Sequence, residues 1–387
     1  MYCYVAYTTY CSYLDSSGGV AVLGLENSQL NIWRTDMTEC GRRLVYFDEW
    51  MDPSGPERAR TLSGVELIEL DSAGSTDKNW QALSGAHGHQ LRPSTETPEI
   101  YYPRGDFFQR CPNLLAIGSA GAGYDMVNVD DCTKAGVLLF NQTGANAESV
   151  AQHVLAMMLT LTKQLIQSDR AMRSSHRNWT RWDYSGRELT GRTLGIVGLG
   201  NIGRCVARIT GAVFRMRVIA YDPYLADSDF AERGADKCDN LENLFREADF
   251  VSINCPLTDE TRGMINQDLF NVMKETAYFV ITARGGIYDE LALEDVLRAG
   301  RIAGAGLDVF EQEPPAAEHP LLKFDNVLVS PHNAGITDDA NLNMVTSALE
   351  QWTDIFAGRR PRNLINPSAW DAFQTRYQSV FGLNAVV

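Results

Sequence analysis

The sequence predicts an α/β protein built from two doubly wound parallel sheets. From residue 42 onward, short apolar segments of strand length alternate with segments of helical periodicity, which is typical of parallel strands joined by crossover helices. The chain has 387 residues, more than one hydrophobic core usually supports, so we expect two domains. Its 44% hydrophobic and 21% charged residues are ordinary globular values and exclude a disordered or fibrous chain.

The expected strands are short apolar segments that recur along the chain. In order they are RRLVYF, VELIEL, LLAIGS and VLLFN, followed by TLGIVGLG, RVIAYD, FVSINC, YFVITA, IAGAGLDV and NVLVSPH. A long helix is predicted after VLLFN, with Asn146 as its N-cap and apolar residues at helical spacing from Val150 to Leu165. A second long helix is predicted from Leu342 to Phe356. We interpret these helices as the crossings between two domains, one of which interrupts the other.

The charge and the cysteines limit the classes of partner. Lys and Arg number 34 against 49 Asp and Glu, which gives a net charge of −15. Such a surface repels phosphate backbones and anionic lipid, so we expect no nucleic-acid and no membrane partner. The first residues lack the basic segment of a secretory signal. Eight cysteines lie scattered without metal-ligand spacing, which favours reduced thiols in a cytoplasmic protein and no metal site.

Three glycines after the segment TLGIV have GxGxxG spacing: Gly198, Gly200 and Gly203. The spacing alone is weak evidence in a chain with 32 glycines, but an apolar strand precedes it and an amphipathic helix follows it. In that context the glycines allow a tight turn and the close approach of a pyrophosphate, as in a Rossmann dinucleotide site. Asp222 follows about 20 residues later, where a carboxylate binds ribose hydroxyls and repels a 2′-phosphate. The sequence therefore favours NAD over NADP; the alternative is a glycine turn without a ligand.

Three polar residues fall directly after later strands, where doubly wound sheets place their ligands. They are Arg284 after YFVITA, Glu313 after IAGAGLDV and His332 after NVLVSP. Taken singly, each has an ordinary structural explanation. Together they supply what hydride chemistry on a 2-oxo acid needs: a guanidinium for the carboxylate and carbonyl oxygens, an imidazole to move the proton, and a carboxylate to orient the imidazole. We therefore take them as candidate catalytic residues.

With these motifs in this order, the sequence resembles the D-isomer-specific 2-hydroxyacid dehydrogenase family, which includes D-lactate, phosphoglycerate, glyoxylate/hydroxypyruvate and formate dehydrogenases. The motifs are AIGSAGAGYDMVNVD, GANAESVAQHV, TLGIVGLGNIGR, INCPLTDETRGMIN, TARGGIYDE, GAGLDVFEQEP and VLVSPHNAG, within residues 110–360 and with weaker support from residue 42. The resemblance implies two Rossmann-like domains with an active-site cleft between them, a homodimer, and NAD-dependent hydride transfer between a small 2-oxo acid and its (R)-2-hydroxy acid.

The resemblance also implies roles for individual residues. The catalytic trio is Arg284, Glu313 and His332. The substrate carboxylate is bound by backbone N–H groups of the loop from Ser119 to Gly123, with Ala120, Gly121, Ala122 and Asn146 as substrate-binding residues. The cofactor-binding residues are Gly198, Gly200, Asn201, Ile202, Gly203, Asp222, Cys255, Thr282 and Asp308, the last beside the nicotinamide carboxamide.

The expected domain boundaries follow from the motifs and the two crossing helices. We predict a substrate domain at residues 42–149 plus 337–366, an NAD-binding domain inserted at residues 150–336, and a C-terminal tail at residues 367–387. Residues 1–41 show no sustained period and are expected to be a poorly ordered extension. We interpret the first 36 residues as an upstream reading-frame artefact with Met37 as the natural start; the alternative is a flexible arm that packs on a partner subunit.

Departures from family patterns narrow the substrate. Glu313 argues against formate, because formate dehydrogenases carry Gln there. Ser119 stands where many phosphoglycerate dehydrogenases carry a basic residue, and the chain ends soon after its last predicted helix, which leaves no room for a regulatory domain. We expect an unphosphorylated substrate such as glyoxylate or hydroxypyruvate. The alternative function is that of an NAD-binding, co-repressor-like interaction protein on the same fold.

The remaining histidines and tryptophans singled out in the sequence have simpler explanations than a metal or substrate site. His87 and His89 in HGH are interpreted as part of a polar loop, because no third metal ligand is near in sequence. Trp179 and Trp182 are interpreted as anchors of domain packing, and His153 on the first long helix as a packing or inter-subunit residue.

Overall fold

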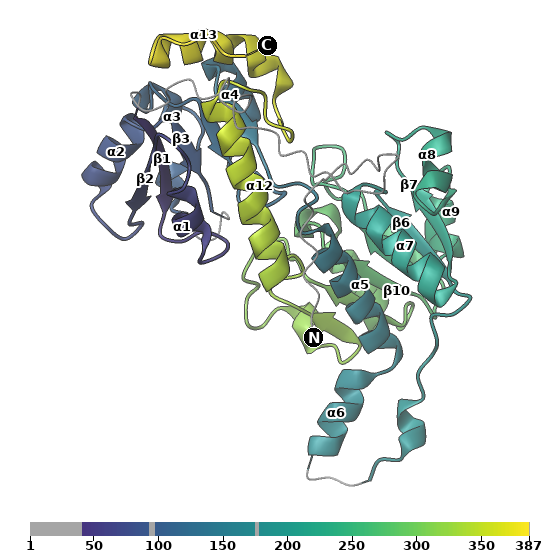
Figure 1. The fold of residues 1–387 in the computed structure, drawn as a ribbon. Helices are drawn as coiled ribbons and strands as arrows, with labels where there is room; N and C mark the ends of the chain where they lie inside the picture. The colour runs from purple at the N-terminus through teal and green to yellow at the C-terminus, as the bar shows by residue number, and fades with distance from the viewer. Residues whose placement is uncertain (1–40, 93–96, 175–177, 387) are drawn as a thin grey trace, which may run out of the picture.

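The computed structural model describes residues 41–92, 97–174 and 178–386. They form two parallel sheets, each with helices on both faces, so the predicted fold class is confirmed (Figure 1). The expected extension at residues 1–41 lies outside the described residues apart from Gly41, and so does Met37, the expected natural start of the chain. None of the helices in the described part of the chain combines the length and the apolar character needed to cross a membrane.

The first sheet has five parallel strands in the order β2-β1-β3-β4-β5. They are β1 (Arg42–Phe47), β2 (Val65–Leu70), β3 (Gly88–Gln90), β4 (Ala116–Gly118) and β5 (Leu138–Phe140). On β1, Val45 and Phe47 face a core that includes α2 (Thr76–Ser84), α3 (Phe107–Arg110) and α4 (Val129–Ala135). Leu44 and Tyr46 face the opposite core, shared with α1 (Gly55–Ala59), α12 (Asp338–Phe356) and α13 (Trp370–Phe381). The alternation of side chains along the strand thus buries both faces of the sheet.

The second sheet has seven strands in the order β12-β11-β10-β9-β6-β7-β8. They are β6 (Thr193–Val197), β7 (Arg217–Tyr221), β8 (Asp236–Lys237), β9 (Phe250–Ile253), β10 (Tyr278–Ile281), β11 (Gly304–Leu307) and β12 (Val327–Val329). One core contains residues of α5 (Ala147–Thr162), α7 (Asn201–Phe214) and α8 (Asp227–Glu232). The other contains residues of α9 (Leu241–Glu247), α10 (Gln267–Asn271) and α11 (Glu290–Arg298).

The strand order reverses direction at β6, which pairs with both β7 and β9. In open α/β sheets, ligands bind in the crevice outside the carboxyl ends of the strands at such a reversal. The glycine loop follows β6, and the segments with the candidate catalytic residues follow β10, β11 and β12. The fold therefore directs both groups of residues toward the same edge of the second sheet.

The chain after α12 differs from the expected tail at residues 367–387. It contains a 3₁₀ turn, η7 (Pro367–Ala369), and then α13, whose Phe373 and Tyr377 are buried in the core of the first sheet. Aromatic residues recur along α13 at four-residue spacing, and neighbouring rings contact one another in tilted and edge-on arrangements. That spacing forms an apolar stripe on one face of a helix, which explains why this segment packs instead of hanging free.

The interpretation of HGH as a polar loop is wrong. Residues Gly88–Gln90 form β3 in the interior of the first sheet, between β1 and β4. His89 is fully buried beside Phe47 and Phe107, and burial lowers its pKa to about 3, so the ring is neutral. A Cβ on Gly88 would lie 2.6 Å from Trp352, so the strand needs glycine there. The polar residue types of HGH did not predict a strand, although the side chains around it are apolar.

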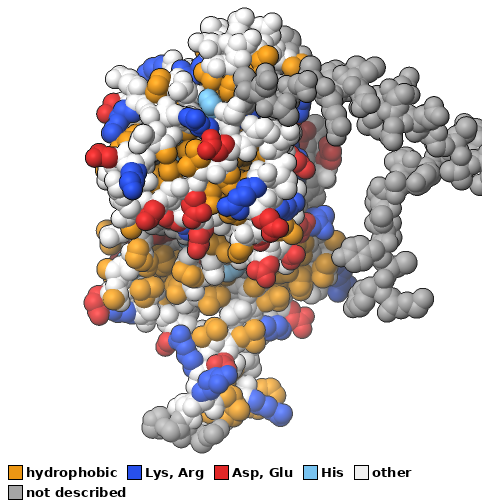
Figure 2. Space-filling model, turned by 60° about the vertical axis from the view of Figure 1, so that its left-hand side comes forward, with side chains coloured by type: hydrophobic (Ala, Val, Ile, Leu, Met, Phe, Trp, Pro, Cys, Tyr) orange, Lys and Arg blue, Asp and Glu red, His pale blue; other side chains and the backbone are white. Residues whose placement is uncertain are grey.

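A segment between α5 and β6 projects from the body of the protein. It contains α6 (Leu165–Arg173) and the 3₁₀ turn η4 (Arg181–Tyr184), and Figure 1 shows it extending below the second sheet. Leu165, Met172 and Trp182 are exposed here, with Trp182 at 71%. In Figure 2 hydrophobic and basic side chains share this segment. The prediction that Trp182 anchors domain packing is therefore wrong, because its side chain extends into solvent.

Candidate active site

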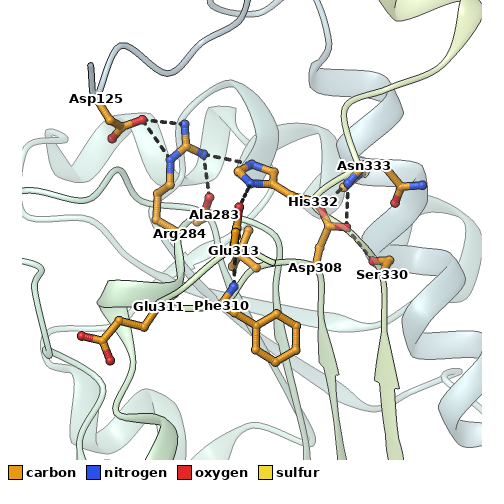
Figure 3. Close-up of polar contacts among 12 residues, drawn as sticks. Asp125, Ala283, Arg284, Asp308, Phe310, Glu311, Glu313, Ser330, His332 and Asn333 are labelled. Atoms are coloured by element: carbon orange, nitrogen blue, oxygen red, sulfur yellow. Dashed lines mark hydrogen bonds and ion pairs between the residues drawn. The ribbon is translucent and has the colours of Figure 1, made fainter. Parts of the chain in front are cut away.

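The three candidate catalytic side chains meet at the carboxyl edge of the second sheet (Figure 3). Arg284 follows β10, Glu313 lies in the segment after β11, and His332 follows β12. Arg284 Nη1 lies 3.4 Å from His332 Nε2, and His332 Nδ1 lies 2.7 Å from Glu313 Oε2. The imidazole thus has a carboxylate at one nitrogen and a guanidinium at the other, an arrangement that suits proton transfer at Nε2.

The Glu313 carboxylate is held from two directions. Its Oε2 contacts His332, and its Oε1 accepts a hydrogen bond of 3.0 Å from the Phe310 N–H. Burial raises the pKa of Glu313, but the hydrogen bond and charge of His332, the Phe310 N–H and the Arg284 charge outweigh burial, so the pKa lies below its ordinary value. Glu313 is therefore ionised at neutral pH. An ionised carboxylate orients Nδ1 of the imidazole as a donor and leaves Nε2 directed at Arg284.

The backbone of His332 has a left-handed conformation, with φ of 52°. A residue other than glycine holds such a φ only where its surroundings fix it, and Asp308 does so here. The His332 N–H donates to the Asp308 carbonyl oxygen over 2.8 Å. The Asp308 carboxylate is 1% exposed and accepts hydrogen bonds from Asn333 N, Ala334 N and the Ser330 hydroxyl. The segment that presents His332 is thus anchored on a buried carboxylate.

Arg284 reaches from the second sheet to the loop after β4 of the first sheet. Its Nη1 donates to the Ala283 carbonyl oxygen over 2.8 Å, and its Nε and Nη2 lie 3.2 and 3.1 Å from Asp125 Oδ2. A Cβ on Gly123 would lie 1.9 Å from Arg284 Nη2. A side chain at position 123 would require the guanidinium to shift from this position, so the candidate substrate loop and Arg284 fit closely together across the two domains.

The candidate substrate loop, residues Ser119–Gly123, has its carbonyl oxygens bound to the protein. Asn141 Nδ2 donates to Ala122 O over 2.6 Å, and Gln142 Nε2 donates to Ser119 O over 3.1 Å. The Gln142 N–H donates to Gly121 O over 2.9 Å. Within the described residues, the N–H groups of positions 120–123 have no acceptor. Consecutive free N–H groups form a concavity that suits a carboxylate.

The glycine loop after β6 has the steric features of a dinucleotide site. A Cβ on Gly198 would lie 2.7 Å from Cys255 N, and a Cβ on Gly203 would lie 2.2 Å from Gly198 O. A Cβ on Gly200, in contrast, meets nothing within 4 Å. Gly200 is the N-cap of α7, a helix of 14 residues that begins without a side-chain cap. The loop thus leaves open space beside the free N–H groups of a helix N-terminus, where a pyrophosphate fits.

Asp222 lies at the end of β7, beside this loop. Its Oδ2 accepts a hydrogen bond from the Leu199 N–H over 3.0 Å, and its Oδ1 accepts one from the Tyr224 N–H over 3.1 Å. These bonds fix a carboxylate next to the glycine turn, which fits recognition of ribose hydroxyls. A cation also contacts this loop, because Arg233 Nη1 donates to the Leu199 carbonyl oxygen over 2.8 Å.

The remaining predicted residues surround the crevice in different ways. Cys255 packs against Gly198, and burial raises the pKa of its thiol to about 11, so it is a protonated lining group. Thr282 is buried at the end of β10, and Asn201 and Ile202 form the first turn of α7. Asn146, the N-cap of α5, lies against Gly335 in the segment after His332. Asp308 is enclosed by its hydrogen-bond donors, which suits an anchor of that segment.

Sequence reasoning missed two groups that contact the site. Asp125 stands in the quoted motif AIGSAGAGYDMVNVD, but its contact with Arg284 joins residues 159 positions apart. Ser330 bridges Asp308 and His153, since its hydroxyl donates to Asp308 and lies 3.0 Å from His153 Nε2. His153 therefore packs within the chain beside the anchor of the His332 segment. The positions of Asp125 and Ser330 within quoted motifs were the signal that the sequence offered.

Comparisons with known proteins agree with this geometry. Residues 155–334 match the NAD-binding domain of the D-isomer specific 2-hydroxyacid dehydrogenases. Over 261 residues the chain is 38% identical to a D-3-phosphoglycerate dehydrogenase of Archaeoglobus fulgidus, with 67% of this chain and 49% of that protein covered. Over 263 residues it is 37% identical to a glyoxylate reductase of Korarchaeum cryptofilum, with 67% of this chain and 79% of that protein covered.

A solved structure extends the similarity to the whole fold. The D-lactate dehydrogenase of Aquifex aeolicus, complexed with NAD and lactic acid, has a TM-score of 0.71 and 26% identity, with 84% of this chain and 99% of that chain covered. The chain spans about half the length of the phosphoglycerate dehydrogenase from Archaeoglobus fulgidus. Residues 155–334 therefore form an NAD-binding domain, and the chain belongs to the D-isomer specific 2-hydroxyacid dehydrogenase family.

Proposed function

We propose that the protein is an NAD-dependent dehydrogenase that interconverts small 2-oxo acids and (R)-2-hydroxy acids. The observation that supports this most strongly is the contact of Arg284 with both His332 and the candidate substrate loop. A proton donor, a cation and a set of free N–H groups are thereby brought together beside a dinucleotide crevice. A 2-oxo acid presents a carbonyl and a carboxylate that require these groups.

Each group of the candidate site has a separate role in the proposed hydride transfer. NADH, when bound along the glycine loop, supplies the hydride. The N–H groups of residues 120–123 bind the substrate carboxylate, and Arg284 stabilises the negative charge that develops on the carbonyl oxygen. His332 holds a proton at Nε2 for that oxygen, while Glu313 fixes the other ring nitrogen. In the oxidative direction His332 begins neutral and takes the hydroxyl proton.

We propose an unphosphorylated substrate of the size of glyoxylate or hydroxypyruvate. A phosphate requires cations beyond the one that binds the carboxylate. Arg284 is already paired with Asp125, and Ser119, at the start of the loop, is buried with its hydroxyl donating to the Gly123 carbonyl oxygen. Relatives of both kinds exist, since one is a glyoxylate reductase and another a phosphoglycerate dehydrogenase.

A panel assay tests activity and substrate together. Glyoxylate, hydroxypyruvate, pyruvate, phenylpyruvate and 3-phosphohydroxypyruvate are each offered with NADH and with NADPH, and loss of absorbance at the reduced nicotinamide is followed. We expect turnover of the small unphosphorylated acids with NADH. Preference for the phosphorylated acid contradicts the substrate proposal alone. NADH binding without turnover of any acid contradicts the enzyme proposal and favours the co-repressor-like alternative.

We propose that two copies form a homodimer through the projecting segment of α6 and η4. Leu165, Met172 and Trp182 expose apolar side chains there, and a second copy would remove them from water. Light scattering of the wild-type protein should give twice the chain mass, and a Leu165→Glu/Trp182→Glu variant should give the chain mass with an unchanged circular dichroism spectrum. A monomeric wild type contradicts this proposal. We place the protein in the cytoplasm, where the described cysteines, all free, stay reduced.

A further inference from the structure

Asp125 is the residue of the first domain that binds the Arg284 guanidinium. It lies just beyond the candidate substrate loop, and its Oδ2 takes both Nε and Nη2 of Arg284, at 3.2 and 3.1 Å. Figure 3 shows Asp125 on one side of the guanidinium and His332 on the other. The two carboxylates of the cluster are thus divided between the domains: Glu313 binds the imidazole, and Asp125 binds the arginine.

A guanidinium has two edges that each present a pair of parallel N–H groups, one formed by Nε and Nη2 and the other by Nη1 and Nη2. In Arg284 the first edge is occupied by Asp125. The second edge contains Nη1, which is the nitrogen nearest His332 Nε2. A substrate that binds between Arg284 and His332 therefore meets the second edge, and it need not displace Asp125.

We propose that Asp125 is a positioning residue: by binding the Nε–Nη2 edge of Arg284 it directs the Nη1–Nη2 edge at the substrate oxygens beside His332. This inference rests on the proposed function. Arg284 has a flexible stem, and its backbone neighbour Ala283 fixes Nη1 alone. Asp125 fixes the Nε–Nη2 edge of the guanidinium, and Gly123 leaves the space in which the guanidinium lies.

The placement of Asp125 also couples the reaction to the arrangement of the domains. Asp125 follows β4 of the first sheet, whereas Arg284 follows β10 of the second. The guanidinium has its working orientation only while the two domains hold these residues within hydrogen-bond distance. Small displacements matter here, because a shift of about 1 Å in a positioned group can cost about 100-fold in rate.

Asp125→Ala tests the proposal, with Asp130→Ala as the matched control. Asp130 is an exposed carboxylate in the first turn of α4, five positions further along the same segment. For Asp125→Ala we expect kcat/KM for the 2-oxo acid to fall by about 10- to 100-fold, with a higher KM as well as a lower kcat. The Kd for NADH and the Tm should match those of wild type and of Asp130→Ala. Equal kcat/KM in both variants overturns the proposal.

A double-mutant cycle separates positioning of Arg284 from a general structural effect. Lysine at position 284 keeps the charge but has no second edge to direct. In an Arg284→Lys background, Asp125→Ala should therefore change kcat/KM by less than about threefold, because interacting residues are not additive. An effect as large as in the wild-type background overturns the proposal, since it shows that Asp125 acts on something other than the guanidinium.

Crystal structures supply a readout that does not depend on turnover. In Asp125→Ala the guanidinium should leave its position beside His332 Nε2, whereas in Asp130→Ala it should stay. An Arg284 that remains in place without Asp125 contradicts the positioning role, whatever the activity. If wild type turns over no acid of the panel, the proposed function fails while these structures still decide the inference about Asp125.

Discussion

The protein has two candidate loops for binding anions through backbone N–H groups, and they are held in different ways. In the loop Gly198–Gly203 the glycines are sterically required, since a Cβ on two of them would strike nearby backbone, and the Leu199 N–H is bound by Asp222. The loop Ser119–Gly123 is fixed by side chains from elsewhere, chiefly Asn141 and Gln142, which bind its carbonyl oxygens. Gln142 is itself bound by Gln351 of α12. The glycine spacing of the first loop is visible in the sequence, whereas the side chains that hold the second loop lie elsewhere in the chain.

This difference suits the two ligands. A dinucleotide is common to many enzymes, and a glycine turn followed by a helix N-terminus suits its phosphates. The substrate differs from one relative to the next. The conformation of a loop that is held by separate side chains can change when those side chains are replaced. Variants on each side should therefore separate cofactor binding from substrate turnover.

The largest effect is expected for His332→Ala, on the substrate side. Loss of a general acid costs about 10²- to 10⁴-fold in turnover. Reduction of the preferred 2-oxo acid should fall by at least that factor, while the Kd for NADH, measured by quenching of protein fluorescence, stays within error of wild type. A variant with unimpaired kcat would remove His332 from the mechanism.

Replacing one glycine of each loop by alanine compares the candidate substrate loop with the dinucleotide loop directly. Gly123→Ala places a Cβ where the Arg284 guanidinium lies, so kcat/KM should fall about 100-fold with NADH affinity unchanged. Gly203→Ala forces its Cβ against Gly198 O, so the Kd for NADH should rise by about tenfold, equivalent to about 1.4 kcal/mol. Fluorescence titration and initial rates give both values. If Gly123→Ala weakens NADH binding as much as Gly203→Ala, the two loops are not independent.

Glu313→Gln should change the pH dependence more than the maximal rate. Reduction requires the imidazolium form of His332, so kcat/KM falls as pH rises. The lowered pKa of Glu313 keeps its carboxylate ionised across the working range, where it stabilises the imidazolium. Without that charge, the alkaline fall in reduction should move to lower pH, and the rise in oxidation should move with it. A superimposable pH profile would show that Glu313 does not act on His332.

The smallest effect is expected at the adenosine end of the crevice. Asp222→Asn removes a carboxylate that is expected to repel a 2′-phosphate, while Arg233 stays bound to the Leu199 carbonyl oxygen. The ratio of kcat/KM for NADH to that for NADPH should fall by about tenfold, or about 1.4 kcal/mol, mainly through a lower KM for NADPH. An unchanged ratio would mean that other groups select the cofactor.

Much of the fold is local enough to be predicted. The predicted apolar strands appear in the structure as β1, β2, β4 to β7 and β9 to β12. The two predicted long helices appear as α5, which begins after Asn146, and α12, which contains residues 342–356. Two short strands were not predicted: β3, whose Gly88 and His89 are polar or small types in an apolar setting, and β8 at the sheet edge. Burial in these segments depends on neighbours distant in sequence, which a local pattern does not contain.

The site was predictable to the same extent. Arg284, Glu313 and His332 each follow a recognisable strand, and parallel strands bring their carboxyl ends together. Contacts that depend on how one domain sits on the other gave no signal, as for Asp125 and for the steric role of Gly123. The exposure of Trp182 was missed for the related reason that a projecting segment resembles a buried one when only residue types are known.

The fit of Arg284 over Gly123 limits how this scaffold can be redesigned. A loop grafted from a relative to alter specificity leaves Arg284 in its present position only if it keeps glycine at position 123. Libraries that randomise residues 119–122 while holding position 123 fixed should retain far more active clones than libraries that randomise the full stretch.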